Sequence, residues 1–142
     1  MADSLIMQAS AVAIDGRALL IEGEPGSGKS SLALALIGRG ALLIGDDGVT
    51  ITRTGEQLIA SVPPNIAGLI EVRGVGLVQL PVAQPAPVSL ILTLGVESER
   101  LPESVPARTI MGCDIPCLPF NPGSIAPAER AQWALRMHGL AK

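Results

Sequence analysis

One eight-residue segment constrains this chain more than any other. Residues 23–30 read GEPGSGKS and match the pattern G-x-x-x-x-G-K-[ST] at every fixed position. A strand-like segment, residues 17–21, precedes it, and leucines at helical spacing follow in residues 29–37. Glycines let such a loop wrap so that successive N–H groups point inward, and a helix N-terminus adds partial positive charge. The pattern therefore predicts a phosphate-binding loop between a strand and a helix.

The loop supplies the candidate nucleotide-binding residues. They are Gly23, Glu24, Pro25, Gly26, Ser27, Gly28, Lys29 and Ser30. We expect Lys29 to reach the β- and γ-phosphates of ATP and Ser30 to bind Mg²⁺. Lys29 is one of only two lysines in a chain that otherwise uses arginine, which suits a point charge on phosphate. The alternative is a glycine-rich turn without a ligand, which would leave the match unexplained.

Composition excludes several other classes of protein. A length of 142 residues fits a single domain, residues 1–142. The composition, with 48% hydrophobic and 16% charged residues, excludes a disordered chain. Phe120 and Trp133 are the only aromatic residues and the net charge is −3, so a nucleic-acid partner is not expected. No basic leader and no membrane-length apolar run is present, so we expect a cytoplasmic protein without a membrane partner.

The cysteines and the histidine do not suggest a metal site or a hydrolytic triad. Cys113 and Cys117 with the single histidine, His138, are too few for a zinc site built from soft ligands. Two buried, reduced thiols are the simpler interpretation. His138 lies in a helical stretch near the C-terminus with no nucleophile motif beside it, which disfavours a Ser-His-Asp triad.

The remaining chain is expected to consist mainly of strands. Asp15-Gly16 predicts a hairpin turn, and Thr54-Gly55 predicts a second one. Residues 66–70 are interpreted as a single helical turn, and a final helix is expected from Pro127, with its apolar face toward the core. The expected strands are residues 4–14, 17–21, 41–44, 49–53, 57–62, 76–80, 88–94, 108–111 and 115–120.

Acidic residues supply the second half of the candidate site. Asp46 and Asp47 follow the buried strand 41–44, and one could bind Mg²⁺ while the other accepts a proton from a hydroxyl nucleophile. The alternative is a solvated Asp-Asp-Gly turn between two strands. For Glu71 and Arg73, a local salt bridge and contacts with metal and phosphate are equally consistent with the sequence.

Two stretches together resemble a known family. GEPGSGKSSLALALIGRGALLIGDDGV, followed by LIEVRGVGLVQL, is similar to the catalytic domain of HPr kinase/phosphorylase, the bacterial protein-serine kinase that acts on HPr of the phosphotransferase system. The similarity runs from about Gln8 to the final helix. The chain therefore resembles the short form of the family that is found in some proteobacteria. It implies an α/β fold with a P-loop-containing mixed β-sheet and few helices, akin to phosphoenolpyruvate carboxykinase, and a hexamer.

The resemblance also implies roles for individual residues. Asp47 would take the proton from the substrate serine, and Asp46 completes the acidic pair. Ser30 and Glu71 would hold Mg²⁺ while Lys29 contacts phosphate. Arg100, in Arg100-Leu101-Pro102, corresponds to a phosphate-binding arginine of the family.

Two departures from the family bear on activity. Gln8 stands where the family has a histidine, and glutamine does not titrate near neutral pH. Ser124 stands where the family has an arginine tied to phosphorolysis. The leading hypothesis is therefore a Mg-ATP-dependent protein-serine kinase acting on HPr or an HPr-like phosphocarrier, with phosphorolysis doubtful. The alternatives are a kinase or NTPase with a small-molecule acceptor, and a regulatory module that binds nucleotide without transferring phosphate.

Overall fold

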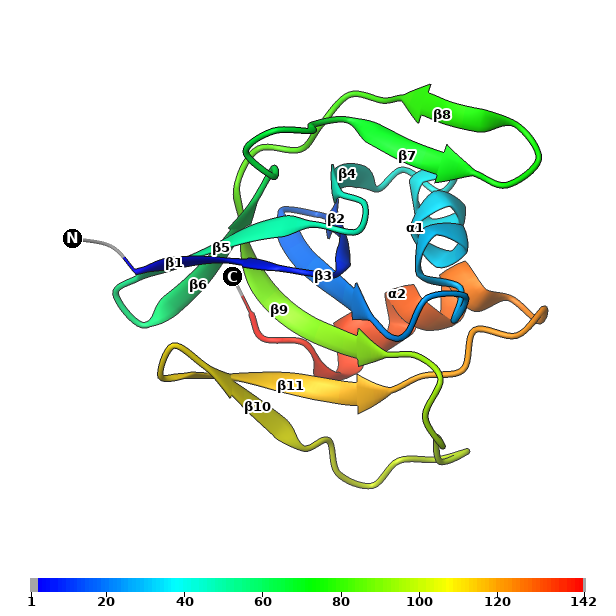
Figure 1. The fold of residues 1–142 in the computed structure, drawn as a ribbon. Coiled ribbons are helices and arrows are strands. Elements are labelled where there is room, and N and C mark those ends of the chain that lie inside the picture. Colours follow the sequence, from blue (N-terminus) through cyan, green and yellow to red (C-terminus); the bar gives the residue numbers. More distant parts are fainter. Residues whose placement is uncertain (1–2, 142) are drawn as a thin grey trace.

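The strand that leads into the glycine loop lies in the middle of a mixed β-sheet (Figure 1). The computed structural model describes residues 3–141. Along the main path of the nine-stranded sheet the strand order is β1-β5-β6-β9-β3-β2-β4, and β10 and β11 extend it from β9. The strands are β1 (Ser4–Met7), β2 (Ser10–Ile14), β3 (Arg17–Glu22), β4 (Leu42–Gly45), β5 (Val49–Thr54), β6 (Gln57–Ser61), β9 (Ala86–Thr93), β10 (Ala107–Ile110) and β11 (Cys113–Pro119).

Within residues 3–141, the strands of this sheet that pair in parallel with each other are β3, β9 and β11, and one isolated parallel bridge joins Leu43 to Val82. β3 pairs in parallel with β9, and β9 pairs in parallel with β11, whereas the other pairs of the sheet are antiparallel. Glu22 at the end of β3 lies opposite Thr93 at the end of β9. The carboxyl ends of parallel strands form the edge where ligands bind in such sheets. The glycine loop therefore leaves the sheet at its functional edge.

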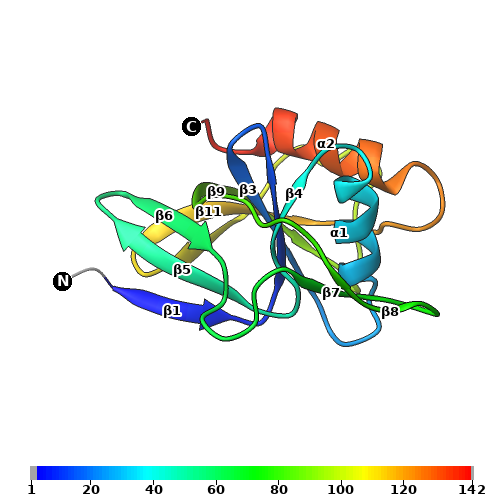
Figure 2. The same cartoon turned by 90° about the horizontal axis from the view of Figure 1, so that it is seen from above.

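Two hydrophobic cores lie on opposite faces of β3 and β9. Leu19 and Ile21 pack toward α1 (Lys29–Ile37) and α2 (Pro127–His138), whereas Leu20 points into the other core, with residues of β5 and β6. Figure 2 shows the helices on one side of β3 and β9, and β1, β5 and β6 on the other. Because strand side chains alternate in direction, the unbroken apolar run of β3 is buried on both faces.

Most expected elements are confirmed, but one expected strand is divided and one expected helical turn is wrong. Helix α1 has the expected bounds, and α2 begins at Pro127 with Ala131 and Leu135 buried. The expected strand 4–14 is divided, because β1 pairs with β5 while β2 pairs with β3 and β4. The expected helical turn at 66–70 is wrong, because Leu69 begins a strand.

That strand, β7 (Leu69–Val72), forms a separate two-stranded sheet with β8 (Gly76–Gln79). Ile70 pairs with Val78 and is fully buried against the helix-side core. The hairpin therefore covers the outer side of α1, as Figure 1 shows. No helix within residues 3–141 has the length and apolar character needed to cross a membrane.

Candidate nucleotide-binding site

The glycines of the loop lie where side chains would not be tolerated. A Cβ on Gly23 would lie 2.5 Å from Ser27 Oγ and 3.0 Å from the carbonyl oxygen of Leu94. Gly26 and Gly28 have φ values of +85° and +103°, in the region that favours glycine. Gly28 is also the N-cap residue of α1, directly before Lys29. These backbone conformations turn the chain from β3 into the N-terminus of the helix.

Lys29 closes this loop through its ammonium group. Its Nζ donates to the carbonyl oxygen of Gly23 at 2.7 Å and to that of Glu24 at 3.3 Å. An ammonium group has three N–H donors, so one donor remains for a ligand. The positive charge therefore lies at the concave side of the loop, beside the N-terminus of α1, where an anion would be stabilised.

A cavity of about 320 Å³ opens in front of the loop. It joins residues from the loop, the first turn of α1, the segment after β4 and the β7–β8 hairpin. Its lining residues are Pro25, Gly26, Gly28, Lys29, Ser30, Ser31, Asp46, Asp47, Glu71 and Arg73. The fold thus brings most of the candidate residues together, from segments far apart in the sequence.

Asp46 connects three of these segments. Its Oδ1 accepts hydrogen bonds from Ser30 Oγ at 2.6 Å and from Ser10 Oγ at 3.0 Å. Its Oδ2 accepts a third bond, from the backbone N–H of Glu71 at 3.2 Å. One carboxylate therefore orients the hydroxyl of the glycine-loop serine and ties the β7–β8 hairpin to it. A P-loop serine beside an aspartate at a strand end is the arrangement that holds Mg²⁺ in P-loop enzymes.

Asp46 and Asp47 are consecutive residues in a tight bend between β4 and β5. Gly45 has no room for a Cβ because the carbonyl of Gly48 lies against it, and Asp47 itself has a φ of +59°. Aspartate tolerates this left-handed conformation better than most residues. The side chain of Asp47 is exposed at the cavity, whereas Asp46 is half-buried. The two neighbouring carboxylates therefore have different environments.

Glu71 and Arg73 extend the charged lining. Residues 3–141 contain two ion pairs, Arg39–Glu129 and Arg108–Glu22, so the alternative of a local salt bridge between Glu71 and Arg73 is not observed. No group of three or more Asp, Glu, His or Cys residues in this range could hold a metal ion alone. Mg²⁺ is usually held by one or two carboxylates together with substrate phosphates, which this lining fits.

Gly23, Glu24 and Ser27 of the loop do not line this cavity, and neither do three further candidate residues from other segments. Arg100 is exposed in the loop between β9 and β10, Gln8 is exposed between β1 and β2, and Ser124 is exposed before α2. From the segment of Gln8, it is Ser10 that reaches Asp46. Sequence reasoning missed Ser10, although a hydroxyl in an otherwise apolar strand was the available signal.

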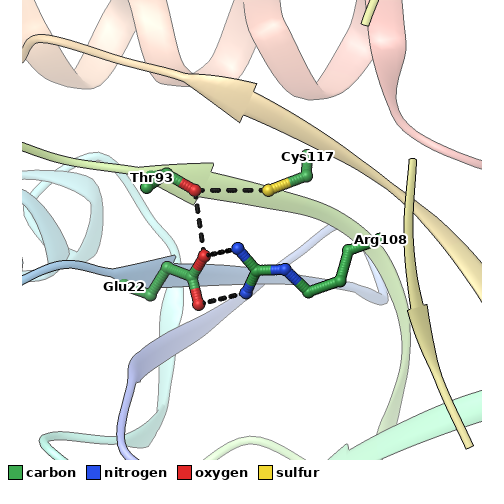
Figure 3. Close-up of polar contacts among 4 residues, drawn as sticks. All are labelled: Glu22, Thr93, Arg108 and Cys117. Atoms are coloured by element: carbon green, nitrogen blue, oxygen red, sulfur yellow. Dashed lines mark hydrogen bonds and ion pairs between the residues drawn. The ribbon is translucent and has the colours of Figure 1, made fainter. Parts of the chain in front are cut away.

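A second polar cluster lies at the carboxyl ends of β3 and β9, directly before the glycine loop (Figure 3). Glu22 forms an ion pair with Arg108 of β10, and Thr93 Oγ1 donates to Glu22 Oε1 at 2.9 Å. Thr93 Oγ1 also lies 3.2 Å from Cys117 Sγ. The hydrogen bond to Glu22 is the main cause that raises the pKa of Arg108 above its ordinary value. This cluster, which sequence reasoning missed, fixes the residue that precedes Gly23.

Comparison with known proteins agrees with this geometry. The sequence model of the HPr Serine kinase C-terminal domain matches residues 1–123. An HPr kinase/phosphorylase of Chlorobium phaeobacteroides is 35% identical over 129 residues, and one of Caldicellulosiruptor bescii is 35% identical over 127 residues. The matches cover 80% and 79% of this chain but only 38% and 41% of the relatives' lengths.

A solved structure gives the same result for the fold. The structure of the Hpr(Ser) kinase/phosphatase from Coxiella burnetii superposes with a TM-score of 0.76 at 30% sequence identity. The match covers 93% of this chain and 89% of that one. The mixed sheet with few helices expected from the sequence is therefore confirmed.

Proposed function

Because this chain belongs to the HPr serine kinase C-terminal domain family, we propose that it transfers the γ-phosphoryl group of Mg-ATP to a serine of HPr or an HPr-like phosphocarrier. The observation that carries the proposal is the hydrogen bond of 2.6 Å between Ser30 and Asp46, with Asp47 beside it at the same cavity. A glycine turn alone would not need a carboxylate aimed at its serine. The arrangement is the one that nucleotide-dependent phosphoryl transfer requires.

The residues present fit a bound Mg²⁺ ion. Ser30 and Glu71 would hold it, and Asp46 would keep the Ser30 oxygen turned toward the cavity by accepting its proton in a hydrogen bond. When bound, the ion neutralises charge on the phosphates and keeps them in place. Lys29 and the loop N–H groups would supply the remaining positive potential.

Asp47 is the proposed base. Its exposed carboxylate would accept the proton of the acceptor serine hydroxyl while the serine oxygen attacks the γ-phosphorus. The bond from that phosphorus to the bridging oxygen of ATP breaks, and ADP leaves with the electron pair. Positioning and charge neutralisation account for most of the rate in this chemistry.

The exposure of Asp47 also favours a protein acceptor over a small molecule. A closed pocket would surround a small acceptor, whereas an exposed carboxylate can be reached by a serine on a protein surface. Arg100 remains a proposed phosphate-binding residue. Serine at position 124, in place of the family arginine, supports weak phosphorolysis relative to kinase activity.

Phosphate transfer from labelled Mg-ATP to purified HPr tests the proposal. Serine phosphorylation is expected with the unmodified chain and is expected to disappear in Asp47→Asn. Asp15→Asn is the matched control, because Asp15 is also an exposed aspartate in a turn with positive φ, +52°, but lies outside the cavity. Transfer that survives in Asp47→Asn would remove Asp47 as the base. ATP binding without transfer would favour the regulatory module or another acceptor.

We also propose a hexamer, which the family resemblance implies, and a cytoplasmic location, which the sequence itself favours. A molar mass measured by light scattering tests the hexamer, and a mass of one chain would contradict it. Cell fractionation tests the location, because HPr phosphorylation requires both proteins in one compartment.

A further inference from the structure

A second cavity, of about 390 Å³, lies beside the glycine loop. It is formed where the loop and α1, the segment after β9 and the segment before α2 approach each other. A Cβ on Gly28 would lie 3.8 Å from Pro122 Cγ, and a Cβ on Gly95 would lie 3.7 Å from Ser27 Cβ. The lining residues are Ser27, Gly28, Ser31, Leu32, Gly95, Asn121, Pro122, Gly123 and Pro127.

This cavity is adjacent to the charged one. Gly28 and Ser31 line both, so the two cavities meet at the first turn of α1. The residues that would take the β- and γ-phosphates and the metal ion, Lys29 and Ser30, line only the charged cavity. In a P-loop the α-phosphate lies at the loop as well. A nucleotide whose phosphates are bound in this order must therefore place its nucleoside beyond Ser31, away from Asp47.

The segment 121–125, which contributes Asn121, Pro122 and Gly123 to the cavity wall, is held in place before any ligand arrives. Arg130 of α2 donates to the carbonyl oxygens of Asn121, Pro122 and Ile125, and its guanidinium lies 4.9 Å from the centroid of the Phe120 ring. A wall already ordered in this way loses little conformational entropy on binding. The segment therefore has the properties of one side of a pre-formed pocket.

We propose that the second cavity holds the nucleoside of ATP and that Asn121 contacts the base. The inference rests on the proposed kinase function and adds the residues that select the nucleotide. Leu32, Pro122 and Pro127 offer apolar surface for a flat ring, and the Asn121 amide can both donate and accept hydrogen bonds. The volume lies within the range of about 300 to 1,000 Å³ found for small-ligand pockets.

Inorganic tripolyphosphate separates the two cavities, because it carries the phosphate chain of ATP without the nucleoside. Binding of Mg-ATP and Mg-tripolyphosphate is measured by calorimetry for the unmodified chain and for Asn121→Trp, whose indole would fill the second cavity. We expect Asn121→Trp to weaken ATP binding by about tenfold or more and to leave tripolyphosphate binding within about twofold. Equal weakening of both ligands, or unchanged ATP binding, would overturn the inference.

Ile125→Trp is the matched control. Ile125 is 79% exposed in the same segment but does not line the cavity, so the added indole should change neither affinity. If Asn121→Trp does not fold, the double variant Asn121→Ala/Pro122→Ala takes its place, with ATP alone expected to bind about threefold more weakly.

The unmodified chain separates failure of the inference from failure of the proposed function. Binding of neither ligand would contradict the kinase proposal itself. Equal affinities for ATP and tripolyphosphate would leave the kinase proposal intact and overturn the nucleoside site, because the nucleoside would then contribute no binding free energy.

Discussion

Two carboxylates flank the glycine loop, and their charges are compensated in different ways. Glu22, at the end of β3, is paired with Arg108 and accepts a hydrogen bond from Thr93. Asp46, just after β4, accepts hydrogen bonds from two hydroxyls and one backbone N–H and takes part in neither ion pair found within residues 3–141. Within residues 3–141 the chain supplies a cation to the first carboxylate, and we propose that bound Mg²⁺ lies near the second.

From this difference we infer a structural role for Glu22 and a functional role for Asp46. The Glu22 side chain is only 17% exposed, and a buried carboxylate without a cation is costly, so its partner stabilises the fold. Asp46 is half-buried and lines the charged cavity, where dipoles from neutral donors suffice and a divalent cation can still be attracted. Substitutions at the two sites should therefore affect different observables.

Among substitutions at these two carboxylates and their partners, the largest expected effect is at Asp46. We expect Asp46→Asn to lower phosphate transfer by about 100-fold and to raise the Mg²⁺ concentration that transfer requires, because the negative charge beside Ser30 is lost. Asparagine keeps the shape and can still accept from the two hydroxyls, but its amide nitrogen cannot accept from the Glu71 N–H, so the melting temperature should fall by only a few degrees. Transfer rate against Mg²⁺ concentration, with a thermal melt, is the measurement. A large fall in melting temperature with an unchanged Mg²⁺ requirement would mean that Asp46, like Glu22, has only a structural role.

Arg108→Met should show the opposite pattern. Leaving Glu22 unpaired is expected to lower the free energy of unfolding by about 2 kcal/mol, which corresponds to roughly 6 °C in melting temperature for a chain of this size. The Arg108 side chain is 38% exposed, so the loss of stability is smaller than for a fully buried ion pair. The Mg²⁺ requirement should stay unchanged. Denaturant unfolding measures the stability.

Two controls sharpen this prediction. The double variant Glu22→Leu/Arg108→Met should regain much of the lost stability, because no unpaired charge remains. Since the pKa of Arg108 is raised, its charge is present at all lower pH values and is lost only as pH rises through that raised value. The stability difference due to the guanidinium should therefore be constant around neutral pH. A double variant as unstable as Arg108→Met would show that packing, not charge, is responsible.

Ser10→Ala tests the support of Asp46 at a smaller scale. Removing one of three donors should reduce transfer by about tenfold while Ser30 still holds the carboxylate. Ser89→Ala is the matched control, because Ser89 is equally buried but its hydroxyl has no hydrogen-bond partner among the described residues. Its replacement should leave transfer unchanged. Equal kinetic effects of the two substitutions would mean that Ser10 acts only through packing.

Thr93→Val is expected to have the smallest effect. It removes one hydrogen bond to Glu22 while the ion pair remains, which should cost about 1 kcal/mol of stability. Unfolding by denaturant measures this loss, and the Mg²⁺ requirement of transfer should be that of the unmodified chain. A changed Mg²⁺ requirement would show that the environment of Glu22 affects metal binding near Asp46, and would contradict the separate roles inferred for the two carboxylates.

Local signals explain what could be predicted from the sequence. The bounds of α1 are correct because the glycines before it and the leucine spacing within it act over a few residues. Asp46 and Asp47 could be placed at the cavity because a short apolar strand ends directly before them. Both predictions rest on residues adjacent in the chain.

Long-range pairing explains the rest. Ile66 to Ile70 has the spacing of a helical turn, but pairing with β8 makes its second half a strand. Glu22 and Arg108 are 86 residues apart, so no local pattern connects them. The support of Asp46 by Ser10 depends in the same way on how β2 lies beside β4.

The pairing of β3 with β9 has a further consequence, for the order of folding. Gly23 packs against Leu94, whose N–H donates to the carbonyl oxygen of Glu22 at 2.8 Å. The loop encoded near the N-terminus is thus completed only by a strand some seventy residues later, and closing so long a segment slows folding. During synthesis we expect the nascent chain to gain phosphate affinity only after β9 has left the ribosome, well after the motif itself is exposed.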